Sequence, residues 1–212
     1  MSRGNRRTAI FKDPLDYICF LECLKHIKDK YSFKIHSICL MTNHFHMAVE
    51  TAETEIGKIM QKVLSIYAEE FNHRHSFTGH LFEGRYTSCL IEDERYLLEV
   101  SRYIHLNPVK AMMVREPLAY EYSSYSLFVS EPDKGVEMER SFTVFSEPAA
   151  RKKLPAAAGL ISELVTTSRI LGCFRHNSRE QYRMFVEGKI SHAEQELLIQ
   201  KDMNENEMWL PW

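Results

Sequence analysis

Cysteine, glycine and proline are all scarce in this chain of 212 residues, which has five cysteines, eight glycines and seven prolines. The cysteines form no C-x-x-C pair, and an odd number of them cannot all pair within one chain. This argues against a small fold stapled by disulfides. The low glycine and proline content also excludes collagen-like and low-complexity chains. We therefore expect a globular protein with a full hydrophobic core.

Long apolar runs are absent as well. No stretch approaches 18 uncharged apolar residues, so the sequence offers no membrane-spanning helix. The basic N-terminus, MSRGNRRTAIFKDPLDY, has no apolar segment of the kind that secretory signals carry. These observations predict a reduced, cytoplasmic protein with no membrane partner.

An excess of charge of one sign is also missing, because 27 lysines and arginines stand against 29 acidic residues. A general polycation that coats nucleic acid is therefore excluded, although a local basic patch is compatible with this balance. Arg3, Arg6, Arg7 and Lys12 form such a patch, and no acidic residue precedes them. Arginine suits phosphates and guanine edges, so these residues are candidate DNA contacts. A solvated N-terminal tail is the alternative interpretation.

The apolar periodicity predicts an α+β fold, with helices packed on an antiparallel sheet. Thr42 and Asn43 separate two short β-rich runs, which indicates a hairpin. Thr54 is the expected cap of the second helix, and Pro108 is expected to end the third near Asn107. In order, the predicted elements are a helix over 14–29, strands over 33–41 and 44–50, a helix over 54–71, a strand over 85–91 and a helix over 92–106.

His44 and His46 flank Phe45 inside the second predicted strand. The period of two places both imidazoles on one face, about 7 Å apart along the strand, and turns Phe45 toward the opposite side. Two imidazoles at this separation can bind one metal ion. A pair of half-exposed histidines without a ligand is the alternative.

Tyr103 and Asn107 lie four residues apart in the third predicted helix and therefore share one helical face. Polar residues flank them in the run YIHLNPVKA. The tyrosine is a candidate nucleophile, because a phenol can form a covalent intermediate when its proton is removed. A core tyrosine and an asparagine that merely ends the helix are the simpler interpretations of the two residues taken singly.

Taken together, these motifs resemble the HUH-type single-tyrosine transposases, and among them the REP-associated branch. The resemblance covers about residues 1–130, with the motifs in the order that the family has. His-hydrophobe-His is a weak signal alone, whereas the ordered set is specific. A further segment, Tyr182–Gly188, resembles the C-terminal helical extension of longer members. The segments that carry the main resemblance are Ser2–Arg7, Met41–His46, Gly79–Tyr86, Tyr96–Ala111 and Ser123–Tyr125.

The resemblance implies a ferredoxin-like HUH nuclease domain over residues 1–130, a linker over 131–148 and a helical C-terminal extension over 149–212. It further implies a transposase that cuts and rejoins single-stranded DNA, typically at a hairpin, through a phosphotyrosine intermediate. Whether such a protein acts as a monomer or a homodimer stays open at this point.

Residue by residue, the resemblance makes Tyr103 the nucleophile and His44 and His46 the metal ligands, with Asn107 at the place of a third, oxygen ligand. The expected ion is Mg²⁺ or Mn²⁺, although imidazoles alone would also accept Zn²⁺. Two further residues, Arg85 and Tyr86, are weaker candidates for DNA contact, since a tyrosine can stack on an unpaired base.

Two features depart from the family pattern. Thr42 stands where proline is usual, and the strand that normally precedes the Arg-Gly-Asn-Arg segment is missing from a chain that begins at Met1. A hairpin-binding protein that has lost cleavage is therefore one alternative function. A zinc-dependent hydrolase, in which His44 and His46 activate water and Tyr103 takes no part, is another.

Overall fold

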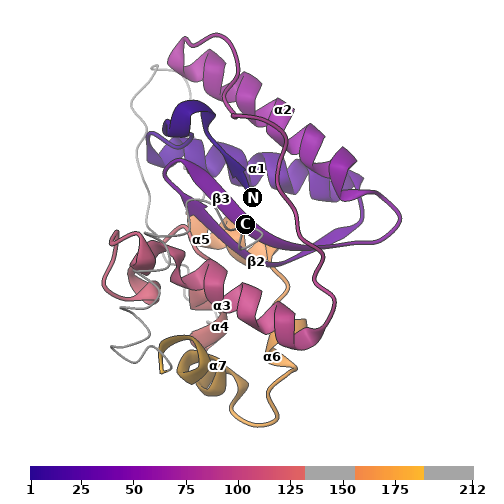
Figure 1. Cartoon of the computed structure of the whole chain (residues 1–212), viewed down its shortest axis with the longest axis vertical. Helices are drawn as coiled ribbons and strands as arrows, with labels where there is room; N and C mark the ends of the chain where they lie inside the picture. Colours follow the sequence, from indigo (N-terminus) through magenta and orange to yellow (C-terminus); the bar gives the residue numbers. More distant parts are fainter. Residues whose placement is uncertain (132–155, 189–212) are drawn as a thin grey trace.

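The computed structural model describes residues 1–131 and 156–188. At its centre is an antiparallel sheet in which β3 (His44–Thr51) lies between β1 (Ser2–Arg3) and β2 (Phe33–Met41). Figure 1 shows helices α1 (Pro14–Lys30) and α2 (Ile56–His75) on one side of the β2–β3 hairpin and α3 (Glu94–Lys110) on the other. Shorter helices from later in the chain complete the second layer. The predicted α+β class, with additional helices toward the C-terminus, is therefore confirmed.

The first two helices differ from the prediction only at their ends. At the start of α1, the Asp13 side chain accepts a hydrogen bond from the Asp16 backbone N–H, and Pro14 occupies the first turn. The predicted cap at Thr54 is wrong, because α2 begins at Ile56 with Glu55 before it and no side-chain cap. This helix also continues to His75, so the polar run after Phe71 is helical rather than a loop.

The expected end of the third helix near Asn107 is wrong as well, because α3 runs through Pro108 to Lys110. Asp93 caps its start by accepting from the Tyr96 N–H at 2.7 Å. A proline removes one backbone bond from a helix, and here it falls in the last turn, where that loss matters least. The Ala111 N–H still donates to the Asn107 carbonyl at 2.9 Å, which closes the final turn.

Residues 85–91 do not form the predicted strand. The segment just before them runs beside the N-terminus, where the Glu83 N–H donates to the Arg3 carbonyl at 3.0 Å. Met1 and Thr87 exchange two further backbone hydrogen bonds, each of 2.9 Å. Because β1 is only two residues long, its edge offers too few backbone partners for a regular strand. The chain was expected to lack its N-terminal strand. The structure has a short strand there, Ser2–Arg3, which pairs with β3.

The outer edge of β2 is covered by two later segments. The Leu40 N–H donates to the Tyr122 carbonyl and the Ser124 N–H to the Ile38 carbonyl, both at 2.9 Å. Farther along the same edge, the Thr166 N–H donates to the Ile35 carbonyl at 2.8 Å. Thr166 lies in the link between α5 (Ala157–Leu164) and α6 (Ser168–Leu171), so this link bonds to the sheet while α5 packs on α1 and α6 on α3.

The predicted domain boundaries remain predictions. Nearly all of the expected linker, 131–148, lies outside the described residues, as do 149–155 and 189–212 of the expected extension. Its described part forms α5, α6 and α7 (Ser178–Glu187).

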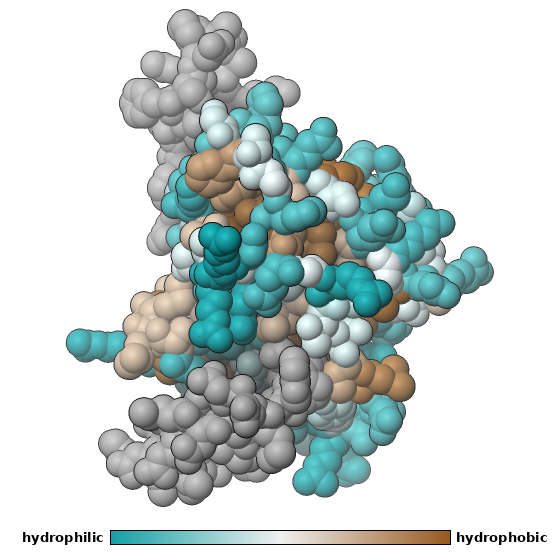
Figure 2. Space-filling view, turned by 45° about the horizontal axis from the view of Figure 1, so that its top comes forward, coloured by the Kyte–Doolittle hydropathy of each residue, from teal (hydrophilic) through white to brown (hydrophobic). Residues whose placement is uncertain are grey.

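The main core lies between the sheet and the α1–α2 layer. Phe45 is wholly buried there, with its ring centroid 4.7 Å from that of Phe20. This orientation leaves His44 and His46 on the opposite face, as the period of two predicted. On the surface shown in Figure 2, hydrophilic side chains predominate and hydrophobic ones form small patches between them. Within residues 1–131 and 156–188, no helix has the length and apolar character needed to cross a membrane.

Candidate active site

The structure brings together the two histidines of β3 and the tyrosine of α3. The ring centroids of His44 and His46 lie 4.9 Å apart, with the rings nearly perpendicular. The Tyr103 ring packs against His46 with a centroid separation of 5.4 Å, again nearly perpendicular. Three residues predicted from the sequence, on two separate elements, therefore share one small site.

Burial keeps both imidazoles neutral near pH 7. It lowers the pKa of His44 to about 4, with smaller contributions from the positive charges of Arg3 and the N-terminal amine. Burial likewise holds the pKa of His46 well below its ordinary value, assisted by the neighbouring His44. A neutral imidazole has a lone pair for a metal ion, whereas an imidazolium has none.

Asn43 orients the first histidine. Its Oδ1 accepts a hydrogen bond of 2.6 Å from Nδ1 of His44, which places the hydrogen on Nδ1 and leaves the lone pair on Nε2. Its Nδ2 donates to the Arg7 carbonyl at 3.2 Å. Asn43 thus joins the basic N-terminal turn to the imidazole. Residues that hydrogen-bond to metal ligands commonly fix the orientation of the ligand in this way. From the sequence, Asn43 was expected only to form part of a tight turn.

Asn107 is suited to supply an oxygen. It is 8% exposed, and its Nδ2 donates to the Tyr103 carbonyl at 2.8 Å. This bond fixes the amide and leaves Oδ1 with its acceptor capacity. Two neutral imidazoles and an amide oxygen are a donor set that fits Mn²⁺ well and Mg²⁺ adequately.

Two cations flank the site. Arg3 pairs with His44 across the β1–β3 ladder, so both side chains stand on the same face of the sheet. The Lys110 ammonium lies 4.6 Å from the centroid of the Tyr103 ring. Lys110 was not among the predicted site residues, although positions 103, 107 and 110 recur at helical spacing and so share one face of α3.

The other predicted DNA contacts lie farther out. Arg6 and Arg7 are exposed in the turn of η1 (Asn5–Arg7), with φ values of 52° and 58°. The ammonium of Lys12 sits 4.0 Å from the centroid of the Phe77 ring, at the end of α2 rather than against the histidines. Arg85 is exposed as well.

Tyr86 lies on a cavity that begins at the site. The cavity has a volume of about 430 Å³, and His46, Tyr86, Leu97 and Ile104 are among the residues that line it. It therefore opens between β3, α3 and the segment that was expected to be a strand. Its volume would accommodate a nucleobase, and its lining has both apolar and polar groups.

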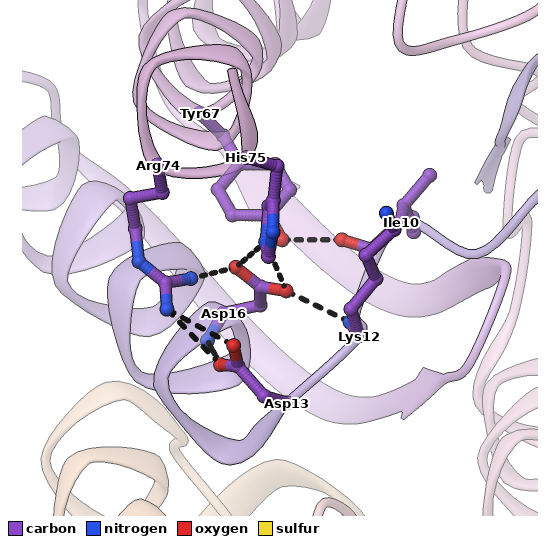
Figure 3. Close-up of polar contacts among 7 residues, drawn as sticks. All are labelled: Ile10, Lys12, Asp13, Asp16, Tyr67, Arg74 and His75. Atoms are coloured by element: carbon purple, nitrogen blue, oxygen red, sulfur yellow. Dashed lines mark hydrogen bonds and ion pairs between the residues drawn. The ribbon is translucent and has the colours of Figure 1, made fainter. Parts of the chain in front are cut away.

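A second group of potential metal ligands, Asp13, Asp16 and His75, lies at the start of α1. Figure 3 shows that the buried Asp16 carboxylate is already surrounded by donors from the protein, namely the Arg74 guanidinium, the His75 ring and the Lys12 backbone N–H. Arg74 also contacts Asp13 at 3.1 Å. A cation of the protein thus occupies the position that a metal ion would take. This cluster ties α1 to α2.

Comparison with known proteins agrees with this architecture. The family described as "Transposase IS200 like" matches residues 1–107, half of the chain, and the chain belongs to that family. A solved structure of a REP-associated tyrosine transposase bound to a REP hairpin matches with a TM-score of 0.52 at 15% sequence identity. The match covers 73% of this chain and 88% of the other, and it shows a shared fold. No curated protein matches the chain.

Membership of this family identifies the protein as one of the HUH tyrosine transposases, a class of DNA-processing enzymes. The family match ends at Asn107, inside α3. The helices α4 (Tyr125–Val129) to α7 therefore lie beyond the part of the chain that carries the family pattern.

Proposed function

We propose that this protein is a single-strand DNA endonuclease and strand transferase that uses Tyr103 as its nucleophile. The observation that carries the proposal is the packing of the Tyr103 ring against His46, 5.4 Å between centroids, with His44 immediately beside it. Two potential metal ligands beside a potential nucleophile are the arrangement expected for metal-assisted attack on a phosphodiester.

In the proposed reaction, the Tyr103 oxygen attacks the scissile phosphorus and gives up its proton to solvent. The bond from phosphorus to the 3′-oxygen breaks, and that oxygen leaves as a 3′-hydroxyl after taking up a proton. The product is a 5′-phosphotyrosine, which keeps one phosphodiester in place of another. A 3′-hydroxyl can therefore reverse the step and rejoin the DNA without an external energy source.

His44, His46 and Asn107 would hold the divalent ion, Mg²⁺ or Mn²⁺. Such an ion polarises a phosphate oxygen and stabilises charge on the leaving oxygen. The protein's own contribution is to keep both imidazoles neutral, to fix the His44 tautomer through Asn43 and to hold the phenol against His46. Lys110 beside the phenol would favour its ionised form.

The proposed partner is single-stranded or hairpin DNA, the latter by analogy with the REP hairpin bound by the structural neighbour. Arg3 on the histidine face is the best-placed phosphate contact, and Arg6 and Arg7 continue the basic surface outward. Tyr86, on the cavity beside His46, would stack on the base next to the cleaved phosphate. Lys12 and Arg85 would contact DNA away from the scissile bond.

Covalent trapping tests this proposal. The full chain is incubated with labelled single-stranded hairpin DNAs and Mn²⁺, and the mixture is separated on a denaturing gel. We expect a slow band whose nucleotide maps to Tyr103 by peptide mass spectrometry, and which is lost in EDTA, in Tyr103→Phe and in His44→Ala. Tyr96→Phe, a tyrosine seven residues earlier on the same helix, is the matched control and should retain the band.

The alternatives give different results in the same assay. Hydrolysis that persists in Tyr103→Phe would replace the nucleophile by water and favour a zinc-type hydrolase. Hairpin binding without an adduct, under every metal condition, would indicate a DNA-binding protein that does not cleave.

A further inference from the structure

A buried chain of hydrogen bonds crosses the second layer of the molecule, from α7 through α3 to the sheet. The Tyr182 hydroxyl lies 2.6 Å from the Ser101 hydroxyl and 2.7 Å from Nδ1 of His105. On the other side of the imidazole, Nε2 lies 2.8 Å from Oγ of Ser124. Ser124 in turn accepts from the Ile38 N–H at 3.0 Å and donates to the Ile38 carbonyl at 3.2 Å.

All residues in this chain of hydrogen bonds are inaccessible to water. Ser101, His105, Ser124, Tyr182 and Ile38 are each 0% exposed. Because Ser124 donates to the Ile38 carbonyl, its oxygen accepts from Nε2 of His105, and Nδ1 then accepts from the Tyr182 hydroxyl. Every polar atom in the chain has a partner, so the arrangement specifies one geometry rather than several.

The chain holds α3 on both sides of the proposed nucleophile. Ser101 and His105 stand two residues before and two residues after Tyr103, and both meet the single hydroxyl of Tyr182. The Arg102 guanidinium also lies over the Phe185 ring, 5.1 Å from its centroid. Three contacts from α7 therefore hold α3 at residues next to Tyr103 in sequence. They lie on the side of α3 that faces away from the histidines.

We propose that Tyr182 is a positioning residue, which fixes the rotation and height of α3 through Ser101 and His105 so that Tyr103 stays against His46. This inference rests on the function proposed above. Tyr182 lies well beyond residues 1–107, the part that matches the family. The C-terminal helices would thus belong to the catalytic apparatus of this chain without touching DNA or metal.

The physical reason is that the Tyr182 hydroxyl satisfies two buried polar groups of α3 at once, Oγ of Ser101 and Nδ1 of His105. If the Tyr182 hydroxyl is removed, Ser101 and Nδ1 of His105 lose a partner that buried water cannot easily replace. The helix can then turn slightly to find other partners. A displacement of about 1 Å in a reacting group is enough to slow catalysis strongly.

The test compares Tyr182→Phe with two matched variants. Tyr67→Phe removes another wholly buried hydroxyl, which donates to the Ile10 carbonyl, far from α3. Tyr125→Phe removes a hydroxyl that donates to Glu187 of α7 at 2.6 Å, and it keeps the aromatic ring that packs on His105. For each protein we measure the thermal midpoint, the affinity for hairpin DNA and the single-turnover rate of adduct formation.

We expect Tyr182→Phe to lower the rate by about tenfold or more with less than a twofold change in affinity, because positioning acts on the chemical step. The two control variants should keep the wild-type rate even where their thermal midpoint falls as far. Equal rate losses in all three, or an unchanged rate in Tyr182→Phe, would overturn the proposal.

Hydrogen exchange separates this inference from the proposed reaction. Peptides that cover residues 99–110 should exchange faster in Tyr182→Phe than in wild type, Tyr67→Phe or Tyr125→Phe, and this measurement needs no DNA. If the wild-type chain forms no adduct, the proposed function fails, while unchanged exchange in Tyr182→Phe would by itself refute the hold of α7 on α3.

Discussion

At the scale of single residues, His105 differs from an ordinary histidine because it carries no charge even in acid. Burial lowers its pKa to about 3, from an ordinary value near 6.5. In the unfolded chain the same imidazole takes up a proton below pH 6.5. The folded state therefore loses stability as the pH falls from 6.5 toward 3, by up to about 1.4 kcal/mol per pH unit for this residue.

We predict that His105→Asn removes this part of the pH dependence. Urea unfolding between pH 7 and pH 4.5 should give a slope that is smaller by about 1.4 kcal/mol per pH unit than that of wild type below pH 6. His26→Asn, at an exposed position of α1, is the matched control for replacing a histidine by asparagine. A slope in His105→Asn equal to the wild-type slope would mean that His105 is protonated in the fold.

The residues of the candidate site could be predicted from the sequence where one local period places them. His44 and His46 follow from the alternation of a strand, and Tyr103 and Asn107 from the spacing of a helix. Asn43 and Lys110 were missed because their roles depend on where the basic turn and the last turn of α3 lie in space. The buried position of Asp16 was hidden for the same reason, since acids in the first turn of a helix are usually solvated.

At the scale of elements, α1 and α2 are joined by the cluster around Asp16, whose carboxylate is wholly buried. Arg74 and His75 contact it from the last turn of α2, and the Lys12 N–H donates to it at 2.8 Å. A carboxylate that compensates a partly buried guanidinium is costly to neutralise, because the remaining cation is left without its partner.

Asp16→Asn should therefore destabilise the fold by about 3–5 kcal/mol. The paired variant Asp13→Asn should cost much less, because this residue is partly exposed and asparagine caps a helix as well as aspartate does. Both values come from urea unfolding at pH 7 with a constant m-value. Equal losses of stability in the two variants would show that Asp13 and Asp16 compensate the Arg74 charge equally.

Elements were predicted well where they are long and periodic, as in α1, β2, β3 and the body of α3. The segment 85–91 has a strand-like composition, yet it forms no strand because its neighbour β1 is two residues long. Pairing partners decide β structure, and a sequence does not state them. Pro108 was given too much weight for a similar reason, since its cost depends on how many helical turns follow it.

At the scale of the whole molecule, part of each edge of the sheet is covered by the chain itself. The residues around Tyr122 and Thr166 bond to β2, and residues 81–87 run along β1. A dimer formed by continuing the sheet from one molecule to the next would need a free edge. The histidines and Tyr103 also lie together within one chain.

We accordingly expect light scattering coupled to size exclusion to give one protein chain of 24.9 kDa, and one chain plus the mass of the DNA when a hairpin is bound. Mixing the His44→Ala and Tyr103→Phe proteins tests separately whether one chain supplies all the catalytic residues. A site built within one chain gives no adduct from the mixture, whereas restored adduct formation would mean that two chains share their catalytic residues.

The covered edge of β2 also has a meaning for synthesis on the ribosome. The Lys28 ammonium donates to the Leu164 carbonyl, 136 positions away in the sequence. The Ile35 carbonyl likewise accepts from the distant Thr166 N–H. Contacts this distant make folding slow, and they form only after most of the chain has been translated. Until then the part of this edge around Ile35 would be bare, so a message truncated before α5 should yield an aggregating product that chaperones retain.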